Sequence, residues 1–413
     1  MSAAAVLAGR GVLPDEAYAA ALLTLPGLWL ARAAALLGLG RRARPGGPGT
    51  RSGEAAWEIV ASGRAADLPA LRALVREAAV DVVAAQWAAA AQRVDVASWW
   101  SAYGRLGVEV DLLGGPGYPA RLAGAPSAPY VVFRRGQHTD LAGTTAAIVG
   151  TRRATPGGRE IAAEFGAGLA AHGVRVVSGL ALGIDAAAHE GALTEDGRHG
   201  DRAGGPIGVV AGGVDRPYPA RHRVLWERVA HAGVLVSEWP LGTTSEGWRF
   251  PARNRLIVAL ADVVVVIESR ETGGSMLTAG LAIERGVPVL AVPGSIRSPA
   301  SSGANRLLRE GAAPACSVDD VLTALSLVPT AAPATADGRP PPTGDAAAVL
   351  AALGWGPVST DTLVARTGLD PRRLSVVTAH LELDGWVAGG PGWWQRVGPG
   401  SDGGTIPGRG GAR

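Results

Sequence analysis

Residues 146–193 constrain the fold of this chain more than any other stretch of its sequence. They contain two short apolar runs, 146–149 and 174–177, and each run is followed by a small or polar turn and then by residues with helical spacing. Two successive strand–turn–helix units are typical of an α/β domain with a doubly wound, Rossmann-like sheet. We therefore expect a mostly parallel sheet, in which the loops at the carboxyl ends of the strands bind the ligand.

The two turns have the composition of a phosphate-binding site. The first contains Gly150, Thr151 and Arg152, and the second contains Ser178 and Gly179. Small residues allow a ligand to approach the backbone, and the amide groups at the start of the following helix favour an anion. These five residues are therefore predicted to contact a phosphate group.

Apolar runs continue through the middle of the chain and predict six strands, at 145–149, 174–178, 206–211, 233–237, 263–268 and 287–292. Helical stretches of roughly ten to fifteen residues separate most of them, which is the spacing that a parallel sheet needs for its crossover connections. Each predicted strand ends in a small or polar turn. Six such turns on one edge predict a long concave rim rather than a single pocket.

Changes in composition along the chain divide it into five segments. Residues 1–104 are rich in Ala and Leu at helical spacing and are expected to form a small helical domain, of the SAM or helix-hairpin-helix type. Residues 105–326 hold the Rossmann-like sheet, residues 327–344 form a linker rich in Pro, Ala and Thr, and residues 345–397 are expected to form a winged-helix-like domain. The tail, 398–413, is predicted to be disordered.

The turn through Pro26 and Gly27 decides between the two types of helical domain. A helix-hairpin-helix motif that grips a DNA backbone would have a second glycine in this turn, where the chain has Leu28-Trp29. A small helical bundle is therefore the favoured interpretation. The tryptophans that follow are expected to fill its core rather than to stack on bases; they are Trp57, Trp87, Trp99 and Trp100.

The composition restricts the chemistry that the chain can support. All 39 basic residues are arginine and the formal net charge is only +3, so a surface that binds nucleic acid requires local clustering of arginines. The single cysteine, Cys316, excludes a disulfide framework, and the histidines show no metal-binding spacing, so no metal or cofactor is expected. No uncharged apolar run reaches about 18 residues, which predicts a cytoplasmic protein without membrane insertion.

The segment Arg249–Arg255 places three guanidinium groups and an aromatic ring beside the predicted sheet. An arginine can hold a phosphate by two parallel hydrogen bonds, so Phe250, Arg253, Asn254 and Arg255 are candidate DNA-binding residues. The alternative is an arginine-rich helix start with Phe250 packed as a staple. On spacing alone, the two interpretations stand equal.

Several of these segments together resemble the DNA-processing protein A family, also called DprA or Smf. Members carry a G-[ST]-R turn followed by S-G-x-A-x-G-I-D-x-x-x-H-x-x-A-L, and this chain has Gly150-Thr151-Arg152, then Ser178–Asp185, His189 and Ala192-Leu193 at the same spacing. The segment Arg249–Arg255 matches the family's F-P-x-R-N-R. The resemblance covers roughly residues 107–325 and makes DNA contact the favoured interpretation for Arg253 in particular.

A further turn, 273–278, matches the family's S-G-S-x-x-T-A with one departure. Gly274, Ser275 and Thr278 are present, but Gly273 stands at the place of the first serine. The turn also has the composition of a helix start capped by Ser275. Capping and anion binding use the same amide groups, so both interpretations hold, and these three residues are predicted to contact phosphate.

The resemblance implies more than the residues themselves do. Family members bind single-stranded DNA as dimers, protect it during natural transformation and help to load a RecA-type recombinase onto it. We therefore expect a non-catalytic, homodimeric single-stranded-DNA-binding protein whose partners are single-stranded DNA and a RecA-type recombinase.

Two other classes of function remain as alternatives. A nucleotide-binding enzyme, such as a phosphoribohydrolase, would use Glu238 or Glu268 at a strand end, but no paired acid or nucleophile accompanies them. Asp185 and His189 are expected to cap a helix and to pack beneath the rim. A double-stranded-DNA regulator would use Arg372-Arg373 at the start of the last predicted helix.

Overall fold

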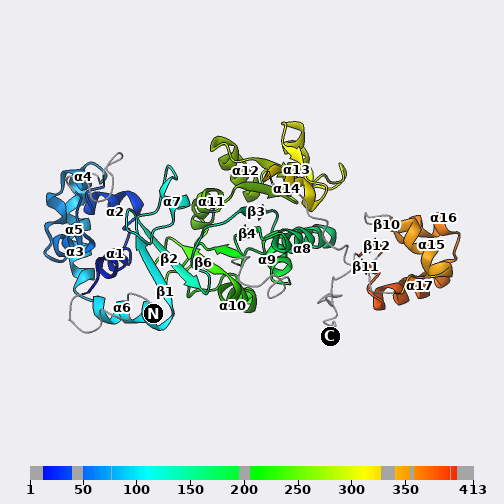
Figure 1. Ribbon diagram of the computed structural model, residues 1–413, viewed down its shortest axis with the longest axis horizontal. Coiled ribbons are helices and arrows are strands. Elements are labelled where there is room, and N and C mark those ends of the chain that lie inside the picture. The colour runs from blue at the N-terminus through cyan, green and yellow to red at the C-terminus, as the bar shows by residue number, and fades with distance from the viewer. Residues whose placement is uncertain are drawn as a thin grey trace.

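The computed structural model describes residues 13–39, 50–75, 77–194, 205–326, 340–353, 358–390 and 392–397. Three folded parts follow one another along these residues: a bundle of helices, a large α/β domain and a small winged-helix domain (Figure 1). Most of the predicted linker and the whole of the predicted tail lie outside the described residues. Within the described residues, no helix is long and apolar enough to cross a membrane.

The α/β domain is built on a nine-stranded sheet with the order β1-β2-β6-β5-β4-β3-β7-β8-β9. The first two strands run antiparallel to their neighbours, and all the other pairs are parallel. The strands are β1 (Val108–Leu112), β2 (Val131–Gly136), β3 (Thr145–Val149), β4 (Arg175–Ser178), β5 (Ile207–Val209), β6 (Val234–Ser237), β7 (Val263–Val266), β8 (Val289–Ala291) and β9 (Ala313–Pro314).

The predicted doubly wound, mostly parallel sheet is confirmed, and the six predicted strands are β3 to β8. Their apolar runs are buried on both faces, as the four valines of β7 show, because helices cover a parallel sheet on each side. The segment before the first predicted strand extends the sheet: β1 and β2 form a hairpin that pairs with β6.

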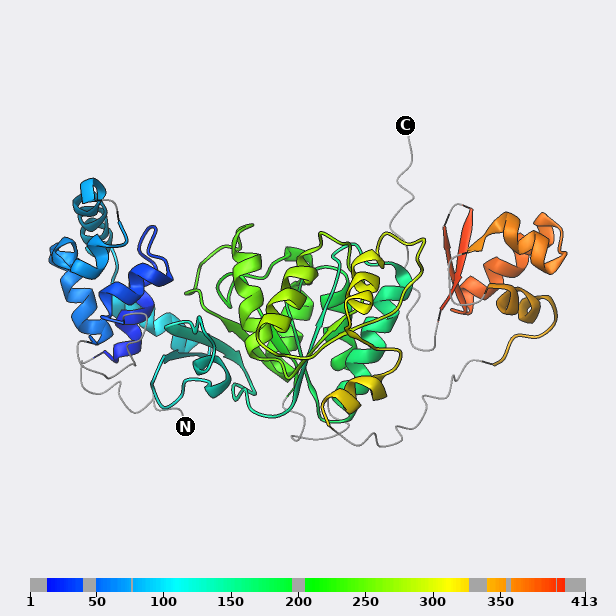
Figure 2. The ribbon, with the colours of Figure 1, turned by 90° about the horizontal axis from the view of Figure 1, so that it is seen from above.

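Two layers of helices cover the sheet (Figure 2). One face packs against α7 (Ala120–Ala123), α11 (Arg249–Ala259), α12 (Gly274–Glu284) and α13 (Ser302–Arg309). The other packs against α8 (Pro156–Ala171), α9 (Ile184–Ala192), α10 (Arg223–Ala232) and α14 (Val318–Ala324), with the short helix η4 (Ala220–His222) before α10. Both faces of the sheet are therefore inside the hydrophobic core.

The order of the strands fixes where a ligand can bind. The chain runs outward from β3 through β4 and β5 to β6, then returns to place β7 on the other side of β3. The loops after β3 and β7 therefore leave the sheet toward opposite faces. The crevice between them is the topological switch point, where doubly wound sheets bind their ligands.

The N-terminal part is a helical bundle, as expected. Its helices are α1 (Asp15–Leu22), α2 (Leu30–Leu36), α3 (Gly53–Ala61), η2 (Arg64–Asp67), α4 (Pro69–Arg72), α5 (Glu77–Ala91) and α6 (Val96–Arg105). Trp57 and Trp87 lie in its core, whereas Trp99 and Trp100 are half-buried against Tyr103. The Tyr103 ring packs on Phe133 of β2 at 5.7 Å, which joins the bundle to the sheet.

The C-terminal part has the helices and the wing of a winged-helix domain. Its elements are α15 (Gly344–Leu353), β10 (Val358–Ser359), α16 (Thr360–Thr367), α17 (Pro371–Leu383), β11 (Val387–Gly390) and β12 (Trp393–Arg396), with the strand order β10-β12-β11. A separate small core, which includes Leu363, Leu374 and Trp386, holds it together. The predicted winged helix is confirmed.

Close packing of α8 on α9 depends on glycine, and this generates a test. A methyl group at Gly166 of α8 would overlap the backbone oxygen of Ala188 in α9, whereas Gly280 of α12 has open space around it. We expect Gly166→Ala to lower the free energy of unfolding by about 2 kcal/mol through overpacking. The matched control, Gly280→Ala, should raise it by about 0.5–1 kcal/mol because Ala favours the helix. Denaturant titration measures both, and equal effects would contradict the packing described.

Candidate functional site

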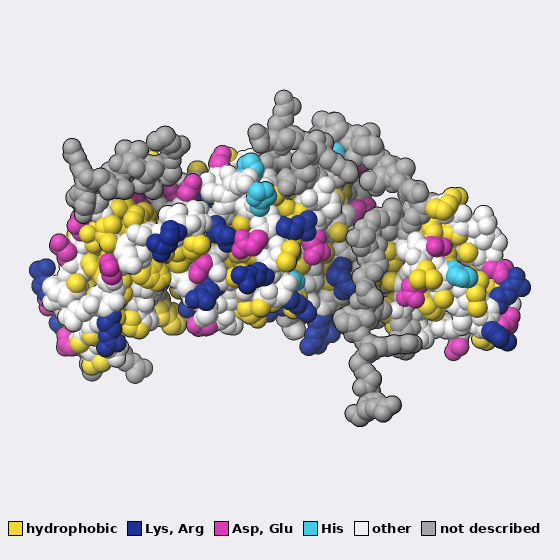
Figure 3. All heavy atoms as spheres, turned by 90° about the horizontal axis from the view of Figure 1, so that it is seen from below, with side chains coloured by type: hydrophobic (Ala, Val, Ile, Leu, Met, Phe, Trp, Pro, Cys, Tyr) yellow, Lys and Arg dark blue, Asp and Glu magenta, His cyan; other side chains and the backbone are white. Residues whose placement is uncertain are grey.

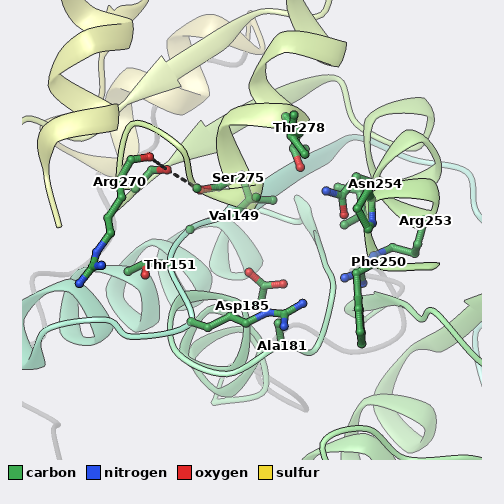
Figure 4. Close-up of a pocket in the computed structure, with 18 of the residues that line it drawn as sticks. Val149, Thr151, Ala181, Asp185, Phe250, Arg253, Asn254, Arg270, Ser275 and Thr278 are labelled. Atoms are coloured by element: carbon green, nitrogen blue, oxygen red, sulfur yellow. Dashed lines mark hydrogen bonds between the residues drawn. The ribbon is translucent and has the colours of Figure 1, made fainter. Parts of the chain in front are cut away.

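An open pocket of about 510 Å³ lies at the switch point between β3 and β7. The turn after β3, the turn after β7, the start of α12 and the first turns of α11 line it (Figure 4). Nine of the twelve predicted site residues meet there, and these are Gly150, Thr151, Arg152, Phe250, Arg253, Asn254, Gly274, Ser275 and Thr278. Segments far apart in the sequence therefore form one site, as the sheet topology requires.

The turn after β3 is fixed by its contacts with β7 and α9. The backbone amide of Thr151 donates to the oxygen of Glu268 at 2.6 Å, and the amide of Ile184 donates to the oxygen of Thr151 at 3.3 Å. A Cβ at Gly150 would come within 2.5 Å of the Ile184 side chain, so only glycine fits there. This turn therefore forms a rigid wall of the pocket.

The expectation that the helix after this turn offers its N-terminus to the ligand is wrong for α8. The Glu268 carboxylate accepts hydrogen bonds from the amide of Thr155 at 2.8 Å and from its hydroxyl at 2.6 Å, and Thr155 in turn caps the helix by accepting from the amide of Gly158. The protein's own anion therefore occupies the N-terminus of α8. Because Glu268 and Thr155 lie 113 residues apart, no local pattern in the sequence pairs them, and Glu268 had no assignable role.

The N-terminus of α12 is the helix end that faces the pocket. Its N-cap residue, Gly273, provides no side-chain cap, and Gly274 and Ser275 begin its first turn. The Ser275 hydroxyl donates to the Ser269 hydroxyl at 2.7 Å, the contact drawn in Figure 4. A Cβ at Gly273 would lie 2.7 Å from that same Ser269 oxygen. Ser269, which the sequence did not single out, thus supplies a hydroxyl next to the position where the family motif has its first serine.

Aromatic and cationic side chains line the opening of the pocket. The Arg152 guanidinium lies 4.6 Å from the centre of the Phe250 ring. The Tyr218 ring packs against the same Phe250 ring, with 5.2 Å between the ring centres. Arg152 and Tyr218 are exposed. Arg270, also exposed, lies across the pocket from Phe250 and Arg253 in Figure 4. Arg270 and Tyr218 were missing from the predicted site; Arg270 is two residues beyond a predicted strand, and Tyr218 lies in the loop that follows another.

Arg253 lies in the wall of the pocket, with only 4% of its surface exposed. Its guanidinium donates to the backbone oxygen of Val209 and lies directly against Gly179, where a Cβ would overlap it. Burial lowers the pKa of Arg253 to about 10, and the negative charge of Asp185 opposes that shift. Arg253 therefore gives the pocket a fixed positive charge from behind its surface.

Asp185 does not cap its helix as expected. The N-cap of α9 is Gly183, and the Asp185 carboxylate instead accepts from the amide of Gly179 at 3.1 Å. Burial raises the pKa of Asp185, while the positive charge of Arg253 acts in the opposite direction. His189 is fully buried beneath the same loop, as predicted. Asp185 holds the loop after β4 through the Gly179 amide, and the two residues make no acid–base pair facing the pocket.

Three predicted site residues do not line the pocket. The Ser178 hydroxyl donates to the oxygen of Ile148 inside the sheet, and Gly179 lies between Asp185 and Arg253. Arg255 points away from the pocket and forms an ion pair with the buried Glu238, which explains the position of that glutamate at a strand end. The structure thus gives these three residues contacts with the protein itself.

Charged side chains of both signs share one face of the α/β domain (Figure 3), and three arginines line the pocket. On the face shown in Figure 3, arginine side chains alternate with Asp and Glu over the α/β domain and form no continuous basic patch. Among the described residues, no group of three His, Cys, Asp or Glu side chains could hold a metal ion. The exposed Arg152 and Arg270 and the buried Arg253 are therefore the cations that a ligand in the pocket meets.

Comparison with known families agrees with this architecture. The DNA recombination-mediator protein A family matches residues 110–326, which contain strands β2 to β9, most of β1 and every segment that lines the pocket. The DprA winged helix domain matches residues 329–392. A doubly wound domain with this site, followed by this winged helix, defines a DNA-processing protein. The chain belongs to the DNA recombination-mediator protein A family, as the sequence motifs predicted.

Individual relatives show how far the similarity extends. The chain is 38% identical over 292 residues to the putative DNA processing protein DprA of Mycobacterium tuberculosis, which covers 68% of this chain and 72% of that protein. It is 35% identical over 226 residues to the DNA processing protein DprA of Bacillus subtilis, covering 54% and 74%. The X-ray structure of DprA from Streptococcus pneumoniae superposes with a TM-score of 0.59 at 28% identity and covers 75% of this chain and 98% of that one.

The electrostatic relation between Arg253 and Asp185 can be tested by stability. Arg253→Met leaves the buried Asp185 carboxylate without its compensating charge, so we expect the free energy of unfolding to fall by about 3 kcal/mol. Adding Asp185→Asn to Arg253→Met removes the uncompensated charge and should restore part of the lost free energy of unfolding. Denaturant titration of the two single variants and the double variant measures the coupling, and strictly additive losses would show that the two charges do not interact.

Burial of His189 predicts a pH dependence of stability. Burial, reinforced by the charge of Arg253, lowers the pKa of His189 to about 4, whereas a histidine in the unfolded chain titrates near 6.5. The free energy of unfolding is therefore highest above about pH 6.5, where His189 is neutral in both states, and it decreases as the pH falls toward 4. When the pH falls from 7 to 5, the free energy of unfolding should decrease by about 2 kcal/mol less in His189→Gln than in the unchanged protein. Denaturant titration at the two pH values measures this difference. An identical pH dependence in both proteins would contradict this assignment.

Proposed function

We propose that the switch-point pocket binds single-stranded DNA. The observation that carries the proposal is the meeting of three kinds of group in one open pocket: exposed arginines, an uncapped helix N-terminus and aromatic rings. Arg152, Arg270 and the first amides of α12 suit the phosphates, because guanidinium groups and helix N-termini both bind oxyanions. Phe250 and Tyr218 offer ring faces on which an unpaired base stacks.

The form of the pocket favours a single strand over a duplex. A base inside a duplex has both faces covered by its neighbours, whereas the rings of Phe250 and Tyr218 lie at the opening and need a free base face. Contact with phosphates and base faces also predicts little dependence on base sequence.

The biological role that we propose follows from membership of a recombination-mediator family. The protein would protect incoming DNA in the cytoplasm during natural transformation and help to load a RecA-type recombinase onto it, acting as a homodimer and without catalysis. The described residues support a binding role, because the carboxylates at the strand ends are engaged by the protein itself: Glu268 at the start of α8 and Glu238 with Arg255.

The two alternatives have less support. A nucleotide-binding enzyme would need a reactive side chain in the pocket, but the carboxylate nearest its floor, Asp185, is buried and hydrogen-bonded to Gly179. A double-stranded-DNA regulator would read bases with α17, where Arg373 is paired with Asp345 at 2.5 Å. The double-stranded-DNA alternative would also leave unused the cations and rings that the switch-point pocket brings together.

The arginines at the opening provide the direct test. Arg152→Ala should weaken binding of single-stranded oligonucleotides of any sequence and reduce the slope of log K against log salt by about 0.7, the value for one phosphate contact on a single strand. The matched control is Arg309→Ala, which removes an exposed arginine of α13 that does not line the pocket. Fluorescence anisotropy across a salt series measures both variants. Equal slopes for Arg152→Ala and the unchanged protein would exclude the pocket as the binding site.

A further inference from the structure

A second pocket, of about 380 Å³, lies where the helical bundle meets the α/β domain. The turn between α1 and α2 forms one side, and the loop after β6 forms the other. Trp248 and Arg249, at the start of α11, complete it. The next residue along α11 is Phe250, which lines the switch-point pocket, so the two pockets are neighbours at one helix end. We call this second site the tryptophan pocket.

Four tryptophans line the tryptophan pocket, and three of them, Trp29, Trp239 and Trp248, pack on one another beside the Arg249 guanidinium. The rings of Trp29 and Trp248 stack at 5.2 Å with an angle of 10° between their planes, and Trp239 meets Trp248 edge-on at 5.5 Å. The Arg249 guanidinium lies 4.3 Å from the centre of the Trp239 ring. Although large apolar rings are normally buried, Trp29 is 58% exposed and Trp248 is 43% exposed. Trp29 covers one face of the Trp248 ring, and the Arg249 guanidinium lies 5.1 Å from the centre of that ring, so the exposed side of Trp29 is where a further ring can stack. We call the Trp29–Trp248 pair the stacking platform.

The platform is held in place before any ligand arrives. In the turn between α1 and α2, the oxygen of Pro26 accepts from the Trp87 indole at 2.8 Å and the oxygen of Gly27 accepts from Arg32 at 2.9 Å. Gly27 has φ +66°, a backbone conformation that favours glycine and that turns the chain toward Trp29. On the other side, the Trp248 indole donates to Glu246 at 2.7 Å. A ligand would therefore bind without a large ordering cost.

Two buried donors in this pocket have no acceptor. Among the described residues, neither the indole nitrogen of Trp239 nor Nε of Arg249 has a hydrogen-bond partner, although both atoms are buried. An unpaired buried donor costs free energy unless a ligand or water supplies an acceptor. Both groups are donors, so the ligand that suits them has exposed oxygen atoms. The rest of the Arg249 guanidinium is paired with Glu246 at 3.4 Å and donates to the backbone oxygen of Thr244, so Nε is the donor left for a ligand.

We propose that the tryptophan pocket is a second DNA subsite, which takes an unpaired nucleobase and its phosphate from the strand that also occupies the switch-point pocket. The inference rests on the proposed function of the switch-point pocket and extends it along the same strand. The base stacks on the exposed side of Trp29, which the Trp248 ring supports from behind, while Arg249 and the Trp239 indole donate to oxygen atoms of the nucleotide. The helical bundle thereby becomes part of the DNA-binding surface through Trp29.

The proposed base contact also explains why the α1–α2 turn departs from a helix-hairpin-helix motif. A helix-hairpin-helix motif would have a glycine where this chain has Leu28-Trp29, and would grip the phosphate backbone with its amides. Here the turn instead presents an aromatic ring to a partner ring from the α/β domain. The same turn would therefore contact the base rather than the backbone.

The experiment compares oligothymidylates of increasing length by fluorescence anisotropy at fixed salt. For the unchanged protein, affinity should rise once the strand is long enough to reach both pockets. Trp29→Ala and Trp248→Ala should lose about 5- to 100-fold in affinity for long strands only, the range expected for one stacked base. Trp29→Phe keeps a ring and should retain most of the gain. Leu74→Ala, which removes another exposed apolar side chain of the bundle, is the matched control and should bind like the unchanged protein.

A strand that is abasic at one end gives a second readout that does not depend on folding of a variant. Two long strands are compared, one abasic in its 5′ portion and one abasic in its 3′ portion. The unchanged protein should lose the length-dependent gain with at least one of them, because a sugar-phosphate chain alone cannot stack. A gain that persists with both abasic strands, or in Trp29→Ala and Trp248→Ala, would overturn the proposal.

Other outcomes identify which claim has failed. If the unchanged protein binds no oligothymidylate of any length, the proposed function itself fails. If short strands bind normally but no gain appears with length, only the tryptophan pocket fails as a DNA subsite. If the gain remains in Trp29→Ala but sedimentation shows weaker self-association, the pocket belongs to a second copy of the chain, which also overturns the proposal.

Discussion

The parallel pairing of β3 with β7 is the constraint on which the binding site depends. It brings residues 146–149 next to residues 263–266 and sends the loops that follow them to opposite faces of the sheet. Glu268, two residues beyond β7, then ties both loops together through the amide of Thr151 and the cap of α8. The pocket is therefore a consequence of strand order, and its side chains have positions set by the core rather than by flexible loops.

Charge in the site is divided between a buried layer and an exposed layer. Arg253 and Asp185 lie inside, where they hold the loop after β4, and Arg152 and Arg270 lie at the opening, where they can meet phosphates. The two layers differ in how salt acts on them, because solvent screens the exposed charges strongly and the buried ones much less. The division also explains how a chain with a net charge of only +3 can bind a polyanion.

Much of the fold could be predicted because its signals are local. Six apolar runs, the turns that end them and the family motifs identified the sheet and most residues of the pocket. The direction of a side chain around a helix was harder to predict: Arg253 and Arg255 are two residues apart on α11, so one faces the pocket wall and the other faces Glu238. Contacts between distant segments, such as Glu268 with Thr155 and Trp29 with Trp248, have no local signal at all.

The central claim is that this edge of the sheet binds a single DNA strand through its phosphates and base faces. The most direct measurement is equilibrium binding of the unchanged protein to matched single- and double-stranded oligonucleotides across a salt series. The account predicts clear preference for the single strand, with log affinity falling linearly as log salt rises. Equal affinity for the two forms, or affinity that is independent of salt, would contradict it.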